Sequence, residues 1–153
     1  MSPNGGSSVD KKKYVLGSIV VFATYMIFDY LVYQGILRGT YESEPLRRLW
    51  RPDIADKMWI LWLVSLVWSF LFSLIYTKGY EARGGMMEGV RFGFWIGLFI
   101  AVPMAFTQYA VYPIPFFLAV QWFIFGTMQT VICGAALALV YRPSKPAVRT
   151  AGE

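Results

Sequence analysis

The chain has 153 residues, of which 57% are hydrophobic and only 15% are charged, which is far more apolar than an ordinary soluble domain of this size. It has no histidine and a single cysteine, Cys133, which excludes an internal disulfide and removes the commonest metal ligand and general base. The net charge of +5 comes from basic residues beside long uncharged runs, typical of membrane topology signals rather than of a nucleic-acid surface. We therefore expect a protein of the lipid bilayer, with no nucleic-acid partner, no metal and no cofactor.

The charge-poor runs have the lengths of membrane spans. Residues 14–37 carry Asp29 as their only charge, and neither residues 58–77 nor residues 92–141 carry any. A transmembrane helix needs roughly 20 apolar residues, so the last run is long enough for two helices. It should turn back at Tyr-Pro-Ile-Pro, residues 112–115, because proline lacks a backbone donor and disfavours helical geometry in the residue before it.

The sequence therefore predicts an all-α membrane protein, a bundle of four transmembrane helices with a short amphipathic outer segment between the first two. The predicted spans are residues 14–37, 58–77, 92–112 and 116–141. They form one transmembrane domain, residues 14–141, between flexible tails at residues 1–13 and 142–153.

Basic residues flank the spans unequally. The side that holds both tails carries nine Lys and Arg residues, and the opposite side carries five. Because basic residues concentrate on the cytoplasmic side, we expect a multi-pass protein of the inner (plasma) membrane with both termini in the cytoplasm.

The outer segment, residues 38–57, is the one sizeable polar stretch between spans. Ser-Glu-Pro, beginning at Ser43, is typical of a helix start, and the following LRRLW places its three apolar residues on one side of a short helix. We expect this helix to lie on the membrane surface, as a connector or as a ligand-binding lid. Asp53 is expected to cap the second span.

Small residues recur at every fourth position in three spans. In lipid, helices associate through close backbone approach, so such stripes predict tight helix packing; glycines that flank a substrate path are the alternative. The longest stripe winds round roughly half its helix, so we expect its glycine half to meet one helix and its alanine half another helix or a second copy. The stripes are Gly85, Gly89, Gly93, Gly97, Ala101 and Ala105 along the third helix, Ser65, Ser69, Ser73 and Thr77 in the second, and Gly126, Thr130, Gly134 and Ala138 in the fourth.

One carboxylate, Asp29, lies inside the first span. Counted from Arg38, it is about 13 Å below the outer boundary. An acid at such a depth costs on the order of 3 kcal/mol and usually faces the protein interior. Since no basic residue lies in any predicted span, we expect a neutral, protonated acid that donates a hydrogen bond.

Residues at the same depth on the other helices are the expected partners. Pro103 lacks an N–H and leaves the carbonyl of Phe99 without its helical donor, so Asp29 is expected to donate to that carbonyl. A structural clasp between helices and a functional site both remain open. The predicted buried polar cluster comprises Asp29, Tyr25, Tyr33, Ser65, Ser69, Phe99, Pro103, Gln121 and Gln129.

The stretches YTKGYEARGGMMEGVRFGFWIGLFIAVPMAF and YPIPFFLAVQWFIFG resemble small bacterial four-span membrane proteins of families of unknown function. The resemblance covers about residues 57–142. It implies a bacterial inner-membrane protein of four helices, and it implies neither an activity nor any functional residue.

Three function classes follow. A noncatalytic membrane protein that packs with itself or as an accessory subunit of a larger complex is suggested by the stripes. A small proton-coupled transporter would use Asp29; short four-span multidrug exporters also carry a first-helix acid, but this chain is longer and has a larger outer loop. A membrane enzyme would rest on the outer acids Glu42, Glu44, Asp53 and Asp56, which solvated interfacial charges explain better. The sequence therefore predicts a protein that is not an enzyme.

Overall fold

The protein forms an all-helical bundle. The computed structural model describes residues 10–80 and 85–141, and within these ranges every regular element is a helix. Four helical segments are long and apolar enough to cross a membrane: Lys11–Ile36, Ala55–Gly79, Gly85–Val111 and Phe116–Val140. The predicted fold class, an all-α protein with four long apolar helices, is confirmed.

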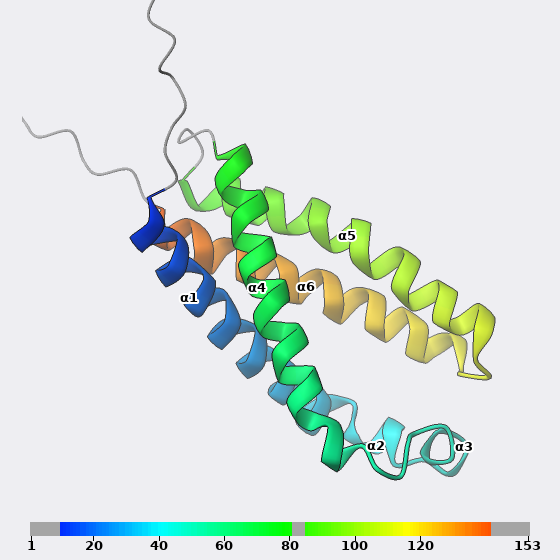
Figure 1. Ribbon diagram of the computed structural model, residues 1–153. Helices are drawn as coiled ribbons and strands as arrows, with labels where there is room; N and C mark the ends of the chain where they lie inside the picture. The colour runs from blue at the N-terminus through cyan, green and yellow to red at the C-terminus, as the bar shows by residue number, and fades with distance from the viewer. Residues whose placement is uncertain (1–9, 81–84, 142–153) are drawn as a thin grey trace, which may run out of the picture.

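The elements follow one another as four long helices with short helical turns after the first (Figure 1). They are α1 (Lys11–Tyr30), the π-helix η1 (Leu31–Ile36), α2 (Arg38–Tyr41), α3 (Glu44–Arg47), the 3₁₀-helix η2 (Ala55–Lys57), α4 (Met58–Gly79), α5 (Gly85–Val111) and α6 (Phe116–Val140).

Two helices begin clearly before their predicted boundaries. The helix of the first span begins at Lys11 rather than at residue 14, because the Asp10 carboxylate accepts the backbone N–H groups of Lys12 (3.1 Å) and Lys13 (3.3 Å) and caps the helix. α5 begins at Gly85, well before the predicted residue 92, since the helix continues through charged residues that the composition count excluded. The rest of the predicted tails, residues 1–9 and 142–153, lies outside the described residues.

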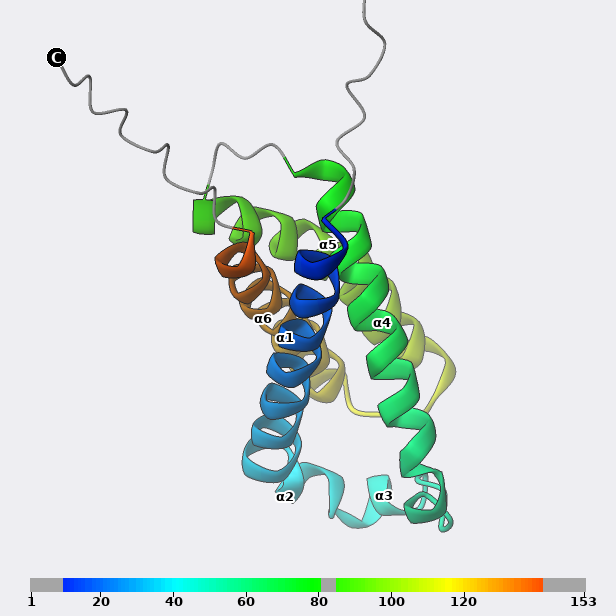
Figure 2. The ribbon, with the colours of Figure 1, turned by 60° about the vertical axis from the view of Figure 1, so that its left-hand side comes forward.

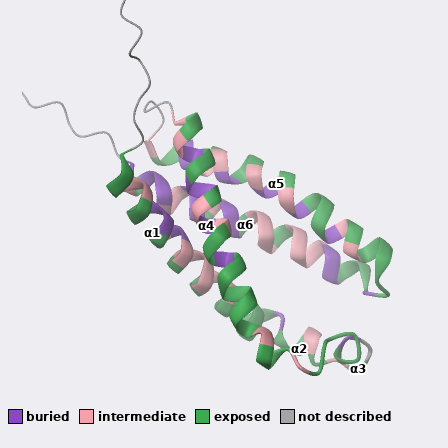
Figure 3. Ribbon diagram, in the orientation of Figure 1, coloured by how far each residue is buried: buried purple, intermediate pink, exposed green. Residues whose placement is uncertain are grey.

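The long helices pair unequally. α5 runs antiparallel beside α6 over its length, whereas α1 packs between α4 and α6 (Figures 1 and 2). The start of α1 and the end of α6 share one end of the bundle, the terminal end; α2, α3 and the 112–115 turn lie at the other, the loop end (Figure 2). Buried residues face the neighbouring helices and the outer surface is exposed (Figure 3). That surface is largely apolar, as lipid contact requires.

The stripe of α5 lies in the α5–α6 interface, where the two backbones touch. An ideal Cβ on Gly93 would lie 2.7 Å from the Cα of Val131, and one on Gly89 would lie 2.7 Å from the Cβ of Ala138. No side chain can be accommodated at such distances, so glycine is required by the close approach.

Both halves of this stripe face α6, which differs from the expectation that the alanine half meets another neighbour. An ideal Cβ on Gly126 would lie 3.4 Å from the Cβ of Ala101, so the contact continues beyond the glycines. A stripe that winds round its helix can follow one partner if the two helices coil about each other. Gly85 is outside the interface: it begins α5 with a φ of 53°, and no atom lies within 4 Å of an ideal Cβ there.

The serines of α4 are buried, and α1 is the main neighbour of this helix. The hydroxyl groups of Ser65 and Ser69 donate to carbonyls one turn back in α4, at 2.8 and 2.7 Å. Their polar atoms are thereby satisfied within the helix, and each serine acts as a small packing residue. Thr77, at the end of the stripe, is partly buried and donates to the carbonyl of Leu74.

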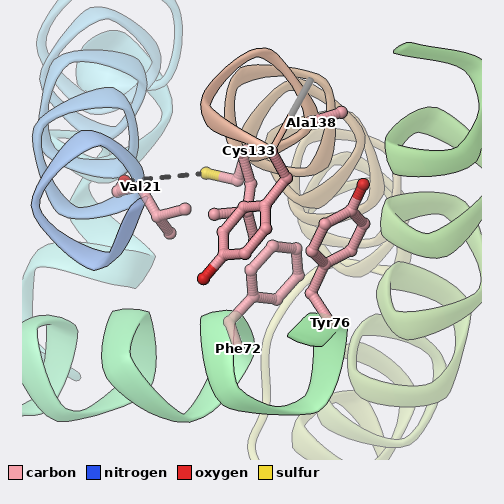
Figure 4. Packing of buried hydrophobic residues seen from close by; sticks show 7 residues of the cluster. Val21, Phe72, Tyr76, Cys133 and Ala138 are labelled. Carbon is pink, nitrogen blue, oxygen red and sulfur yellow. Dashed lines mark hydrogen bonds between the residues drawn. The ribbon is translucent and has the colours of Figure 1, made fainter. Parts of the chain in front are cut away.

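The largest apolar cluster lies towards the terminal end. It joins α1, α4 and α6 and comprises Val21, Phe72, Tyr76, Cys133, Leu137, Ala138 and Tyr141 (Figure 4). Cys133 is fully buried, and its thiol points to the carbonyl of Val21 at 3.9 Å (Figure 4). Its position is that of a packing residue rather than an accessible thiol.

Candidate functional site

The side chain of Gln129 joins α6 to α1 in the middle of the bundle. Its Nε2 donates to the Asp29 carboxylate (Oδ1, 3.1 Å) and to the backbone carbonyl of Tyr25 (3.2 Å). Gln129 is buried, and both hydrogen bonds are partly buried between the two helices. One amide therefore spans a full turn of α1 and fixes the position of its only carboxylate.

This arrangement gives Asp29 a different partner from the one expected. The carboxylate accepts a hydrogen bond from Gln129, whereas Phe99 and Pro103 have exposed side chains on α5, that of Phe99 being 77% exposed. A depth count places residues at the same level of the membrane, but it does not say which face of each helix they occupy.

A pocket of about 110 Å³ lies beside this carboxylate. Residues of all four long helices line it, so it forms where α1, α4, α5 and α6 approach one another. Gly97, Ala101 and Gly126 are among them, and their small side chains leave the space open. Six of the lining residues are aromatic: Tyr25, Phe28, Tyr33, Trp68, Trp122 and Phe125. We call this cavity the Asp29 pocket.

Four of the nine residues predicted as a buried polar cluster meet at the Asp29 pocket: Asp29, Tyr25, Tyr33 and Gln129. Ser65 lies beside the Tyr25 hydroxyl. Ser69 bonds to its own helix, and the buried Oε1 of Gln121 has no hydrogen-bond partner among the described residues. The aromatic lining was not predicted, because nothing in the sequence separates a pocket-lining aromatic residue from a lipid-facing one.

The outer segment is attached to the pocket wall at the loop end. Tyr41 of α2 stacks on Tyr33 with ring centroids 5.5 Å apart, and its hydroxyl accepts a hydrogen bond from the Trp122 indole N–H at 2.5 Å. Burial raises the pKa of Tyr41, so its hydroxyl stays protonated at neutral pH. Leu46 of α3, only 1% exposed, packs on Ile114 and Leu118 and holds the segment against the α5–α6 turn.

A π-helix, η1, begins two residues after Asp29. In η1, the backbone N–H of Leu37 donates to the carbonyl of Val32 at 2.8 Å, a bond across five residues. Both residues are buried and line the Asp29 pocket. Such segments are rare and often occur at functional sites, which makes this stretch the second unusual feature beside the carboxylate.

Three acids of the outer segment, Glu42, Glu44 and Asp53, form exposed ion pairs. Arg38 pairs with Glu42 at 2.8 Å, and Arg48 pairs with Glu44 at 3.5 Å. The hydrogen bonds from Arg51 and Lys57 lower the pKa of the Asp53 carboxyl. The N-cap of α4 has no side-chain hydrogen bond, so Asp53 is an ion-pair partner rather than the expected helix cap. Asp53 bonds to Arg51 at 3.0 Å and to Lys57 at 2.8 Å.

The chain matches no protein family, no curated protein and no solved structure. Within residues 10–80 and 85–141, no three acidic or cysteine side chains lie close enough to hold a metal ion. The function is therefore inferred from the chemistry of the site, and the resemblance to bacterial four-span proteins stays a prediction.

Proposed function

We propose that the protein is a noncatalytic integral membrane protein that works as a homo-oligomer or as an accessory subunit of a larger membrane complex. The observation that supports this is that α4 packs against the rest of the chain on one face only. Its serine face packs on α1, while Val64, Val67 and Leu71 on the opposite face are 51–59% exposed. Apart from Gly85 and Gly126, the stripe residues of α5 and α6 are buried within one chain, so the outer face of α4 is the surface proposed for assembly.

Disulfide cross-linking tests the homo-oligomer. In a Cys133→Ala background, we expect Val64→Cys and Val67→Cys to form dimers on mild oxidation in membranes. Phe99→Cys, at a still more exposed position on α5, is the control and should remain monomeric. If no α4 variant cross-links, affinity purification from native membranes should instead recover a stoichiometric partner. A chain that neither cross-links nor copurifies with another protein would contradict the proposal.

A small proton-coupled transporter is the second candidate, and the Asp29 pocket is the observation that favours it. An intramembrane carboxylate beside a cavity can exchange a proton for a substrate. Asp29→Asn keeps the volume and a hydrogen-bond acceptor for Gln129 but cannot change charge, so it should abolish pH-linked uptake in liposomes while the protein stays folded. Asp29→Glu should keep part of the uptake. If wild-type protein in liposomes moves no protons with any tested cation, this candidate is wrong.

We further propose that both termini are cytoplasmic in the inner membrane, on the support of the nine-to-five distribution of basic residues. A membrane-impermeant thiol reagent tests this in intact cells that express single-cysteine variants. Glu44→Cys at the loop end should be labelled, and Ser144→Cys should not. Labelling of Ser144→Cys but not of Glu44→Cys would show that the protein has the opposite orientation.

A further inference from the structure

We propose that the Asp29 pocket binds a small organic cation, of the size and chemistry of a methylated ammonium group. The cation would be held by the Asp29 carboxylate and by the surrounding aromatic rings. This site is not part of the assembly function proposed above, and it requires neither transport nor proton exchange.

The charge of the pocket favours a cation. Asp29 is the one carboxylate among the described lining residues, and none of them is Lys or Arg. The Gln129 amide donates to the Asp29 carboxyl group, whereas the sequence predicts that Asp29 is a protonated donor. Because this amide is neutral, it orients the carboxylate without cancelling the charge that an ionised Asp29 presents to a cation. Carboxylates inside membrane proteins usually have a counter-ion, and a bound cation would supply one here. The same field would repel an anion.

The walls of the pocket add to this preference. The face of an aromatic ring attracts a cation placed within about 6 Å of the ring centre, most strongly for Trp. The rings are also held in place: Tyr25 packs on Trp68 with centroids 5.1 Å apart, while Tyr33 and Trp122 are both fixed by Tyr41. A site with rigid rings loses little conformational freedom when a ligand enters.

The volume limits the size of the ligand. A cavity of about 150 Å³ in another protein accommodates benzene, so 110 Å³ suits a cation of about four or five heavy atoms. Tetramethylammonium is of this size. Two lining residues, Tyr33 and Met104, are also 40% and 55% exposed, which places a way into the pocket between η1 and α5.

Calorimetric titration of the purified protein in detergent tests the site, with tetramethylammonium chloride as the probe. We expect saturable binding in the millimolar range. tert-Butanol has the same number of heavy atoms and no charge, and it should bind at least tenfold more weakly. Sodium chloride at equal ionic strength should give no saturable heat. These comparisons use the wild-type protein alone, so they do not depend on how any variant folds.

Variants assign the binding to the pocket. Asp29→Asn keeps the acceptor for Gln129 and should weaken tetramethylammonium binding tenfold or more. Trp68→Leu removes one aromatic wall and should weaken it several-fold. Trp95→Leu removes a 63% exposed ring of α5 outside the pocket and should leave the affinity unchanged. Circular dichroism and elution volume confirm the fold of each variant.

Three results would overturn the proposal. The first is no saturable binding of tetramethylammonium, which would mean that the pocket holds only water. The second is equal affinity for tert-butanol, which would mean that charge plays no part. The third is undiminished binding by a folded Asp29→Asn protein, which would place the cation elsewhere.

Discussion

The two sides of α6 are built in opposite ways. Towards α5, Gly89 and Gly93 let the two backbones touch. Towards α1, the contact depends on the Gln129 amide and borders the Asp29 pocket of about 110 Å³. Direct backbone contact fixes the position of α6 against α5. Hydrogen bonds fix its position against α1, where the helices leave room for a ligand. The comparison teaches that the α5–α6 pair is the scaffold and that the α1 side carries the chemistry.

Breaking the scaffold side should have the largest effect. Gly93→Leu places a branched side chain where even a Cβ would lie 2.7 Å from the Val131 Cα, so we expect a loss of about 3 kcal/mol or more in the free energy of unfolding. Unfolding by a denaturing detergent in mixed micelles measures it. Phe99→Leu, at a 77% exposed position of the same helix, should change stability by less than about 0.5 kcal/mol. Equal stability of the two variants would show that close α5–α6 contact is dispensable.

The next effect concerns the outer segment, which α3 attaches to the scaffold. Leu46→Ala empties a site that is 1% exposed and packed on Ile114 and Leu118, so we expect it to cost about 2–3 kcal/mol. Protease sensitivity of residues 38–57 should increase in parallel. Leu49→Ala is the control, because Leu49 is 38% exposed. If both variants lose the same stability, Leu46 does not attach α3 to the α5–α6 turn.

A smaller effect is expected on the α1 side. Asp29→Ala should cost about 1–2 kcal/mol through the lost bond to Gln129, and Asp29→Asn should remain close to wild type because Asn retains an acceptor. Combining Asp29→Ala with Gln129→Ala should cost less than the sum of the two, since both remove one interaction. Strictly additive losses would mean that the amide and the carboxylate do not interact.

The smallest effect lies outside both interfaces and gives a baseline. Arg51 and Lys57 hold the pKa of Asp53 below its usual range, so this pairing stabilises the fold above the unfolded-state pKa. The contribution is lost as the pH falls through the lower, folded-state pKa. Lys57→Gln should raise the Asp53 pKa in a carboxyl-carbon NMR titration, and Lys78→Gln, at the other end of α4, should not change it. An unchanged pKa in Lys57→Gln would exclude the pairing.

Much of the fold could be predicted from the sequence, because membrane spans are signalled by composition alone. Charge-free runs and the prolines at residues 113 and 115 gave all four helices to within a few residues at most ends. The start of α5 was misplaced, since a helix can continue beyond the apolar run that marks its span. The π-helix was also missed: the sequence LVYQGI has no feature that distinguishes five-residue from four-residue hydrogen bonding.

The candidate site was only partly predictable. Asp29 was identified because a carboxylate in an apolar run is unusual, and Gln129 because the depth count places it near the same level. Their pairing depends on the angular position of each residue around its helix, which a depth count does not contain. For the same reason Phe99 was placed near Asp29, although α5 packs along α6 and not along α1.

The Asp29–Gln129 bond also has a consequence during synthesis. Its two residues are 100 positions apart, and at about 5–20 residues per second the ribosome needs roughly 5–20 s to make the second after the first. Until Gln129 is made, the α1 carboxylate has no amide partner. We therefore expect the newly made chain to depend most on the insertion machinery when its first helix is inserted, because that machinery can keep the unpaired Asp29 carboxylate out of contact with lipid.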